Sequence, residues 1–197
     1  TSLRESSWIS LKIFFLILWE TIPLNLIDFF LKENSDFTPF TAQHVWLIIF
    51  CITFGAVLIL WTKEQKETTQ IRVGNIFAFS ISLTVIIGTL LKGYQGNFNY
   101  QEDLPLHLCS FLALIIPILS ISRKYLYYEI FLFLILGGTL QSLITPDEYN
   151  YLNYPFFRYW FVHAGLVIFM FFATVIYKMR PTLKSVGKSF LGMQVYM

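Results

Sequence analysis

Charged residues are scarce in this chain. Asp, Glu, Lys and Arg make up 13% of its 197 residues, and hydrophobic residues make up 56%. An ordinary soluble domain carries about 25% charged residues. The apolar runs are continuous rather than alternating, which argues against a transmembrane β-barrel. The sequence therefore predicts an all-α, polytopic protein built as a bundle of transmembrane helices.

Other absences narrow the function. The chain has no basic patch with interleaved aromatic residues, so we expect no nucleic-acid partner. Its two cysteines, Cys51 and Cys109, both fall inside apolar runs and lack metal-finger spacing, which argues against a structural disulfide. None of the three histidines forms a close-spaced pair of the His-x-x-x-His kind, which weakens any prediction of a metal site.

Five apolar segments are predicted to span the membrane, at 44–61, 73–91, 104–121, 125–144 and 156–177. We expect residues 1–36 to form a separate hydrophobic or amphipathic segment. Its core, 8–31, either spans the bilayer or lies in the interface, and we favour spanning. Residues 37–197 form the bundle, and the apolar run 190–197 is expected to be the start of a truncated further helix.

Basic residues predict the orientation. Threading the five spans places nine of the 14 Lys and Arg residues on one side, in the turn 62–72, the turn 123–124 and the segment after 177. The positive-inside rule assigns this side to the cytoplasm. We therefore expect a multi-pass protein of the bacterial cytoplasmic membrane, with both turns cytoplasmic.

The opposite, outer side gathers the groups that can carry chemistry. All three histidines lie there, and the candidate residues are His44, Asp103, His107, Cys109, Gln141, Asp147, Arg158 and His163. Ionisable groups within a membrane are costly and commonly functional. On a helix, Asp103 and His107 share a face, whereas Cys109 points about 200° away from His107. A base for Cys109 would then be His163 or His44 from another helix.

Structural roles explain several of these residues equally well. Asp103 is placed to cap a helix, His44 suits a helix end at the interface, and Cys109 suits a small apolar packing position. Gly137 and Gly138 allow close helix approach, and a Gln at 141 can bridge helices.

Four segments resemble one known family. They are FTPFTAQH (37–44), DLPLHLCS (103–110), GGTLQSLITPD (137–147) and FFRYWFVHAG (156–165). In this order they are similar to the YwaF-like family of bacterial integral membrane proteins, which is related to eukaryotic transmembrane protein 164. The resemblance runs from about Phe37 to the C-terminus. Family members usually continue into a further helix with an Asn-Tyr motif, which this chain lacks.

The resemblance implies a chemistry. The eukaryotic relative is implicated in moving acyl chains between phospholipids through a cysteine nucleophile, and Cys109 is the cysteine here that lies within a family motif. The first hypothesis is therefore a membrane acyltransferase with a phospholipid substrate and no cofactor. Cys109 would be the nucleophile, His163 or His107 the base, and Asp103 or Asp147 the group that orients it. Gln141, Asp147, Arg158 and His44 would bind substrate.

Two alternatives stay open. Three histidines from three helices could hold zinc in a metal-dependent lipid hydrolase. A polar cavity in a helical bundle could instead bind a solute or dock a partner protein without catalysis.

Overall fold

The computed structural model describes residues 38–94, 98–99, 104–146 and 153–196. The predicted N-terminal segment 8–31 and the two carboxylates Asp103 and Asp147 lie outside the described residues.

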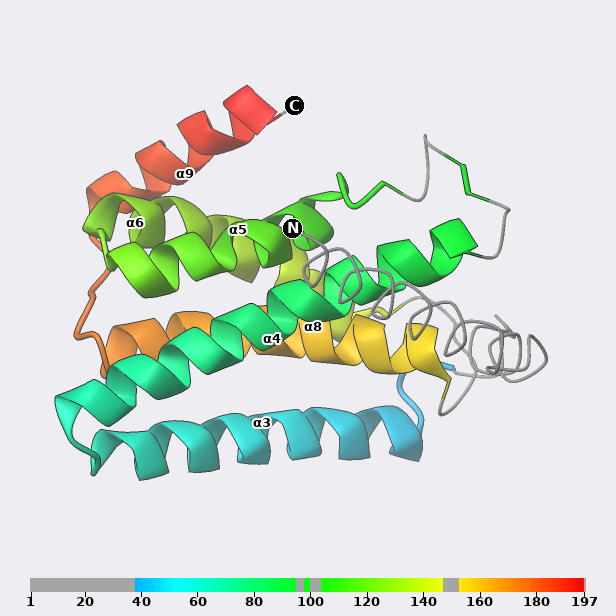
Figure 1. The fold of residues 1–197 in the computed structure, drawn as a ribbon, viewed down its shortest axis with the longest axis horizontal. Helices are drawn as coiled ribbons and strands as arrows, with labels where there is room; N and C mark the ends of the chain where they lie inside the picture. The colour runs from blue at the N-terminus through cyan, green and yellow to red at the C-terminus, as the bar shows by residue number, and fades with distance from the viewer. Residues whose placement is uncertain (1–37, 95–97, 100–103, 147–152, 197) are drawn as a thin grey trace, which may run out of the picture.

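Every regular element in the described part of the chain is helical (Figure 1), which confirms the all-α class. The elements are α3 (Ala42–Lys63), α4 (Glu67–Tyr94), α5 (Leu108–Ser122), α6 (Tyr125–Leu134), the π-helical turn η1 (Ile135–Thr139), α7 (Leu140–Ile144), α8 (Tyr154–Val175) and α9 (Leu183–Tyr196).

Two predicted helix starts were wrong. α4 begins at Glu67 rather than at 73, because Glu67, Gln70 and Arg72 are good helix formers and extend the helix into the predicted loop. α5 begins at Leu108 rather than at 104. Pro105 disfavours helical geometry in the residue before it, and Leu106 N–H instead bonds the Leu104 carbonyl at 2.7 Å in a tight turn.

Within the described residues, four helical segments are long and apolar enough to cross a membrane. They are α3, α4, the continuous segment Tyr125–Ile144 formed by α6, η1 and α7, and α8. α5 has 15 residues, and a helix of that length is about 22 Å long, shorter than a hydrocarbon core of about 30 Å. The chain is thus membrane-embedded and multi-pass, and the fifth predicted span is not established.

α8 is the centre of the bundle. It packs against α3, α4, α5 and the α6–α7 segment, and 72% of its most apolar window is buried, against 11% for α3. Asn153 caps its start by accepting a 2.9 Å hydrogen bond from Phe156 N–H. The buried side chains of Phe169 and Met170 on α8 meet Ile81 of α4 and Leu112 of α5 in the core. α8 therefore provides a rigid frame for side chains at either end.

The predicted threading of the helices is seen in the structure. The α3–α4 turn, the α5–α6 turn and the α8–α9 linker lie at one end of the bundle, on the left of Figure 1. We call this the basic end, because the turns 62–72 and 123–124 and the segment after 177 carry nine of the 14 Lys and Arg residues. The starts of α3, α5 and α8 lie at the other end, which we call the Cys109 end.

Gly74 generates a prediction about the packing of α4 on α8. A Cβ added there would fall 2.1 Å from the Tyr177 hydroxyl and 2.9 Å from Phe172. Tyr177 cannot swing away without losing its edge contact with Phe172. We expect Gly74→Ala to lower the free energy of unfolding by about 1–3 kcal/mol, measured by thermal unfolding in detergent.

Gly187→Ala is the matched control. Nothing lies within 4 Å of an added Cβ on this α9 residue, so alanine should raise stability by about 0.5–1 kcal/mol. Similar effects of the two substitutions would contradict the packing described.

Candidate functional site

The end of α7 organises the Cys109 end of the bundle. The last carbonyls of a helix have no partner within the helix, and inside a membrane no water replaces one. Here two side chains from other helices supply the donors. Tyr159 of α8 donates its hydroxyl to the Ser142 carbonyl at 2.6 Å, and the His44 Nε2 of α3 bonds the Leu143 carbonyl at 2.9 Å. These bonds tie α3 and α8 to the end of α7.

His44 is held on both ring nitrogens. Its Nδ1 accepts a 3.0 Å hydrogen bond from Phe40 N–H, so the ring proton sits on Nε2, which donates to Leu143. The ring is 2% exposed and lies against Phe40 and Trp160, with centroids 5.9 and 5.7 Å away. This placement favours a structural role for His44 over the predicted contact with substrate.

Cys109 is a half-buried, free thiol in the first turn of α5. Its Sγ lies 3.6 Å from the Thr139 hydroxyl, and the Ser142 hydroxyl is a second hydrogen-bond partner. Thr139 ends the π-helical turn η1, a feature often found at functional sites. Within the described residues the thiol's partners are thus two hydroxyls rather than a histidine.

His163 lies two turns into α8 and is half-buried. Its Nδ1 donates to the Tyr159 carbonyl at 2.7 Å, and its ring stacks on Tyr159 at a centroid distance of 4.2 Å. Because the carbonyl fixes the proton on Nδ1, Nε2 is the nitrogen that accepts a proton in the neutral ring.

A chain of contacts joins these groups. Cys109 contacts Thr139 and Ser142, the Ser142 carbonyl accepts the Tyr159 hydroxyl, and Tyr159 stacks on His163. We call these five residues the Cys109 cluster. Within the described residues Cys109 and His163 are linked only indirectly, because Ser142 and Tyr159 lie between them in this chain of contacts, and a base role for His163 stays a prediction.

The other predicted residues are more scattered. Gln141 is exposed, and its amide donates to the Thr145 hydroxyl one turn along at 3.1 Å. Arg158 is half-buried, and its side chain lies against Gly88 of α4. A Cβ added at Gly88 would fall 2.9 Å from the Arg158 Cδ.

His107 requires a correction. It is exposed and takes the N-cap position, with φ −58° and ψ 141°, rather than a place inside the helix. Two predictions assumed that His107 lies inside the helix: that it shares a helical face with Asp103, and that it points about 200° away from Cys109. Both are wrong, because α5 begins only after His107.

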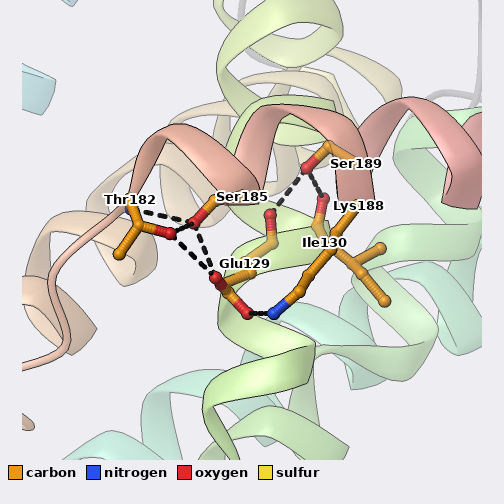
Figure 2. A network of polar contacts seen from close by, with 6 residues as sticks. All are labelled: Glu129, Ile130, Thr182, Ser185, Lys188 and Ser189. Carbon is orange, nitrogen blue, oxygen red and sulfur yellow. Dashed lines mark hydrogen bonds and ion pairs between the residues drawn. The ribbon is translucent and has the colours of Figure 1, made fainter.

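Sequence reasoning missed a second polar centre, at Glu129 of α6. Its side chain is 2% exposed and contacts two side chains of α9 and one just before that helix (Figure 2). Ser185 and Thr182 donate to Oε1 at 2.8 and 3.2 Å, and Lys188 forms an ion pair with Oε2. The signal was present, because a carboxylate inside an apolar run of helical length needs a partner.

Ser189 completes this contact. Its hydroxyl lies 2.6 and 2.8 Å from the backbone carbonyl oxygens of Glu129 and Ile130 (Figure 2). α9 thus turns its serines inward onto α6, and its apolar side chains Phe190 and Leu191 remain 64% and 65% exposed. Among the α9 side chains that the structure describes, polar ones make the contacts with α6.

Comparison with known proteins now identifies the family. The model of the TMEM164 family matches residues 39–197, from the start of α3 through α9. The chain belongs to the TMEM164 family. No curated protein and no solved structure matches the chain significantly. The matched region includes both the Cys109 cluster and Glu129 of this TMEM164-family chain, and it supports a multi-pass membrane protein.

The zinc hypothesis receives no support from the described geometry. Among the described residues, no three His, Cys, Asp or Glu side chains are grouped so as to hold a metal ion. A three-histidine site would also require His44 to leave both the Phe40 and the Leu143 bonds.

His44→Phe tests its structural role. The ring volume is kept, but Phe40 N–H and the Leu143 carbonyl lose their partner, so we expect a loss of about 1–3 kcal/mol in the free energy of unfolding. Val45→Phe, at an exposed position of the same helix, should have little effect. If zinc raised the thermal midpoint of the parent but not of His44→Phe, the result would favour a zinc site that includes His44 over a structural role.

Glu129→Ala tests the attachment of α9. Without the carboxylate, Ser185, Thr182 and Lys188 lose their common partner, and we expect faster hydrogen–deuterium exchange in the amides of α9 but not of α3. Lys184→Ala removes an exposed lysine of α9 that has no bond to Glu129 and should leave the exchange unchanged. Equal exchange in parent and Glu129→Ala would show that other contacts hold α9.

Proposed function

We propose that the protein transfers acyl chains between membrane phospholipids, with Cys109 as the nucleophile. The observation that carries the proposal is the Cys109 cluster: a thiol beside two hydroxyls at a π-helical turn, connected through Tyr159 to a histidine. Its position at the ends of apolar helices suits a substrate whose ester bonds lie just below the headgroups.

The reaction has two steps. In this proposal, substrate binding brings the His163 ring within hydrogen-bond reach of Cys109, so that Nε2 accepts the thiol proton. The Cys109 thiolate then attacks the ester carbonyl of a glycerophospholipid. The carbon–oxygen bond of the ester breaks, a carbon–sulfur bond forms, and the departing lysolipid alcohol takes the proton from His163. In the second step an acceptor lysolipid hydroxyl gives its proton to His163 and attacks the thioester, which restores the thiol and leaves a new ester.

The surrounding residues have supporting roles in this proposal. Burial of Cys109 disfavours the charged thiolate, and the hydroxyls of Thr139 and Ser142, which can donate to sulfur, offset part of this cost. The Tyr159 carbonyl keeps His163 in the tautomer that can act as base. The half-buried guanidinium of Arg158, on the same end of α8, is suited to the substrate phosphate, and Gln141 offers a polar contact for the headgroup.

The orientation is part of the proposal. The basic end would face the cytoplasm of a bacterial cell and the Cys109 end the outer leaflet.

Lipid mass spectrometry of cells that overproduce the parent, Cys109→Ala or Cys51→Ala tests this function. Cys51 is the matched control, because it is also a half-buried free thiol but lies on α3 outside the cluster. We expect the parent and Cys51→Ala to shift the distribution of acyl chains among phospholipids. In Cys109→Ala the rate of acyl transfer should fall by at least about 100-fold, because the nucleophile is lost.

His163→Ala should lose most of the activity as well, since base catalysis contributes about 10²–10⁴-fold. An acyl shift that persists in Cys109→Ala would remove the nucleophile from the proposal. An unchanged lipid profile in every strain, with insertion in the membrane verified, would favour the non-catalytic alternative.

A further inference from the structure

Tyr159 of α8 contacts two members of the Cys109 cluster at once. Its hydroxyl donates to the Ser142 carbonyl at 2.6 Å, and the centroid of its ring lies 4.2 Å from that of the His163 ring. Its backbone carbonyl accepts the His163 Nδ1–H at 2.7 Å. The reaction proposed above gives a role to this carbonyl but none to the Tyr159 side chain.

The Tyr159 ring has little freedom to move. It is 8% exposed and belongs to a small buried cluster with Phe156 and Trp160, against which Leu143 packs. Turning the ring would break its hydrogen bond and leave the Ser142 carbonyl, at the end of a helix inside the membrane, with one donor fewer. The ring therefore keeps one orientation, and the imidazole of His163 is held against it.

The same hydrogen bond also affects the surroundings of the thiol. Ser142 carries one of the two hydroxyls that contact Cys109, and Tyr159 fixes the Ser142 backbone through its carbonyl. The Tyr159 side chain thus connects the turn of α8 that carries His163 with the turn of α7 that carries a partner of the thiol.

We propose that Tyr159 is a positioning residue for acyl transfer and that it acts through His163. An imidazole already held in one rotamer and one tautomer needs only the approach of the two side chains on substrate binding, whereas an unanchored ring also loses rotamer freedom at that step. The inference rests on the proposed function, because the orientation of His163 affects the rate only if His163 is the base. In the competing, purely structural role, Tyr159 only satisfies the end of α7.

Tyr159→Phe separates these roles, because it keeps the ring and removes the hydroxyl. The assay is acyl transfer from phosphatidylcholine to a lysophospholipid in proteoliposomes of the full chain. We expect kcat to fall by about tenfold, within the range that a small misplacement of a catalytic group costs. The KM for the donor should change by less than about twofold, because Tyr159 contacts no substrate in this proposal.

Tyr128→Phe is the matched control. Tyr128 is fully buried, and its hydroxyl lies 2.8 Å from the Thr174 hydroxyl of α8. The same chemical change therefore removes the same kind of bond between helices, but at the basic end of the bundle. Both variants should lower the thermal midpoint, and only Tyr159→Phe should lower kcat. An equal loss of kcat in the two variants would indicate a general effect of loosened packing and overturn the inference.

A double variant tests whether Tyr159 acts through His163. In a His163→Ala background the group that Tyr159 positions is gone, so adding Tyr159→Phe should leave the residual rate unchanged. A further loss as large as in the parent background would show that Tyr159 acts on the thiol or the substrate by another route, and the inference would be wrong.

The histidine tautomers give a readout that needs no substrate. In protein with isotope-labelled histidine, two-bond nitrogen–proton spectra distinguish a proton on Nδ1, expected for His163, from one on Nε2, expected for His44. In Tyr159→Phe the His163 ring should leave its carbonyl partner part of the time and show a mixture of tautomers. Tyr128→Phe should match the parent.

The two readouts separate failure of the inference from failure of the function. A changed His163 tautomer in Tyr159→Phe, with no acyl transfer in the parent, would reject the proposed function and support the positioning of His163 by Tyr159. An active parent whose kcat is unchanged in Tyr159→Phe would leave Tyr159 with its structural role alone, whatever the tautomer.

Discussion

The hydrogen bonds that satisfy the last carbonyls of α7 are the constraint on which the Cys109 end depends. A backbone group left unpaired within a membrane costs several kcal/mol, so the end of α7 must sit where His44 and Tyr159 can reach it. This requirement fixes α3 and α8 relative to α7. The π-helical turn before α7 then determines where Thr139 and Ser142 meet Cys109. The Cys109 thiol is thus positioned by structural polar contacts rather than by a histidine bonded directly to it.

The two ends of the bundle carry different polar side chains, and α8 connects them. α8 carries Tyr159 and His163 near its start, and the chain that leaves it carries Tyr177 and Lys178. Between them α8 is almost fully apolar and packed on four sides. A frame of this kind holds side chains at both ends with little motion between them. α9 belongs to the basic end and contacts Glu129 through polar side chains, whereas its Phe190 and Leu191 are exposed.

The fold could largely be predicted from the sequence, because apolar runs of helical length have few other interpretations. The errors lie at helix starts, where Pro105 stops α5 from beginning early and charged residues extend α4. The gathering of polar groups at one end was also predictable from the threading. The hydrogen-bond partners of these groups could not be predicted. The partners of His44, for example, are backbone groups of Phe40 and Leu143, which the residue types in the sequence do not reveal. The role of Glu129 was visible as a lone carboxylate in an apolar run, but its partners come from a segment more than 50 residues away.

The central claim is that Cys109 carries the acyl chain during transfer. Intact-protein mass spectrometry of the purified protein, mixed with a phosphatidylcholine donor in the absence of acceptor lysolipid, tests it most directly. The account predicts an added mass equal to one fatty acyl group, mapped to Cys109, removed by neutral hydroxylamine and absent from His163→Ala at short times. Acyl transfer that proceeds with no adduct on Cys109 would contradict it.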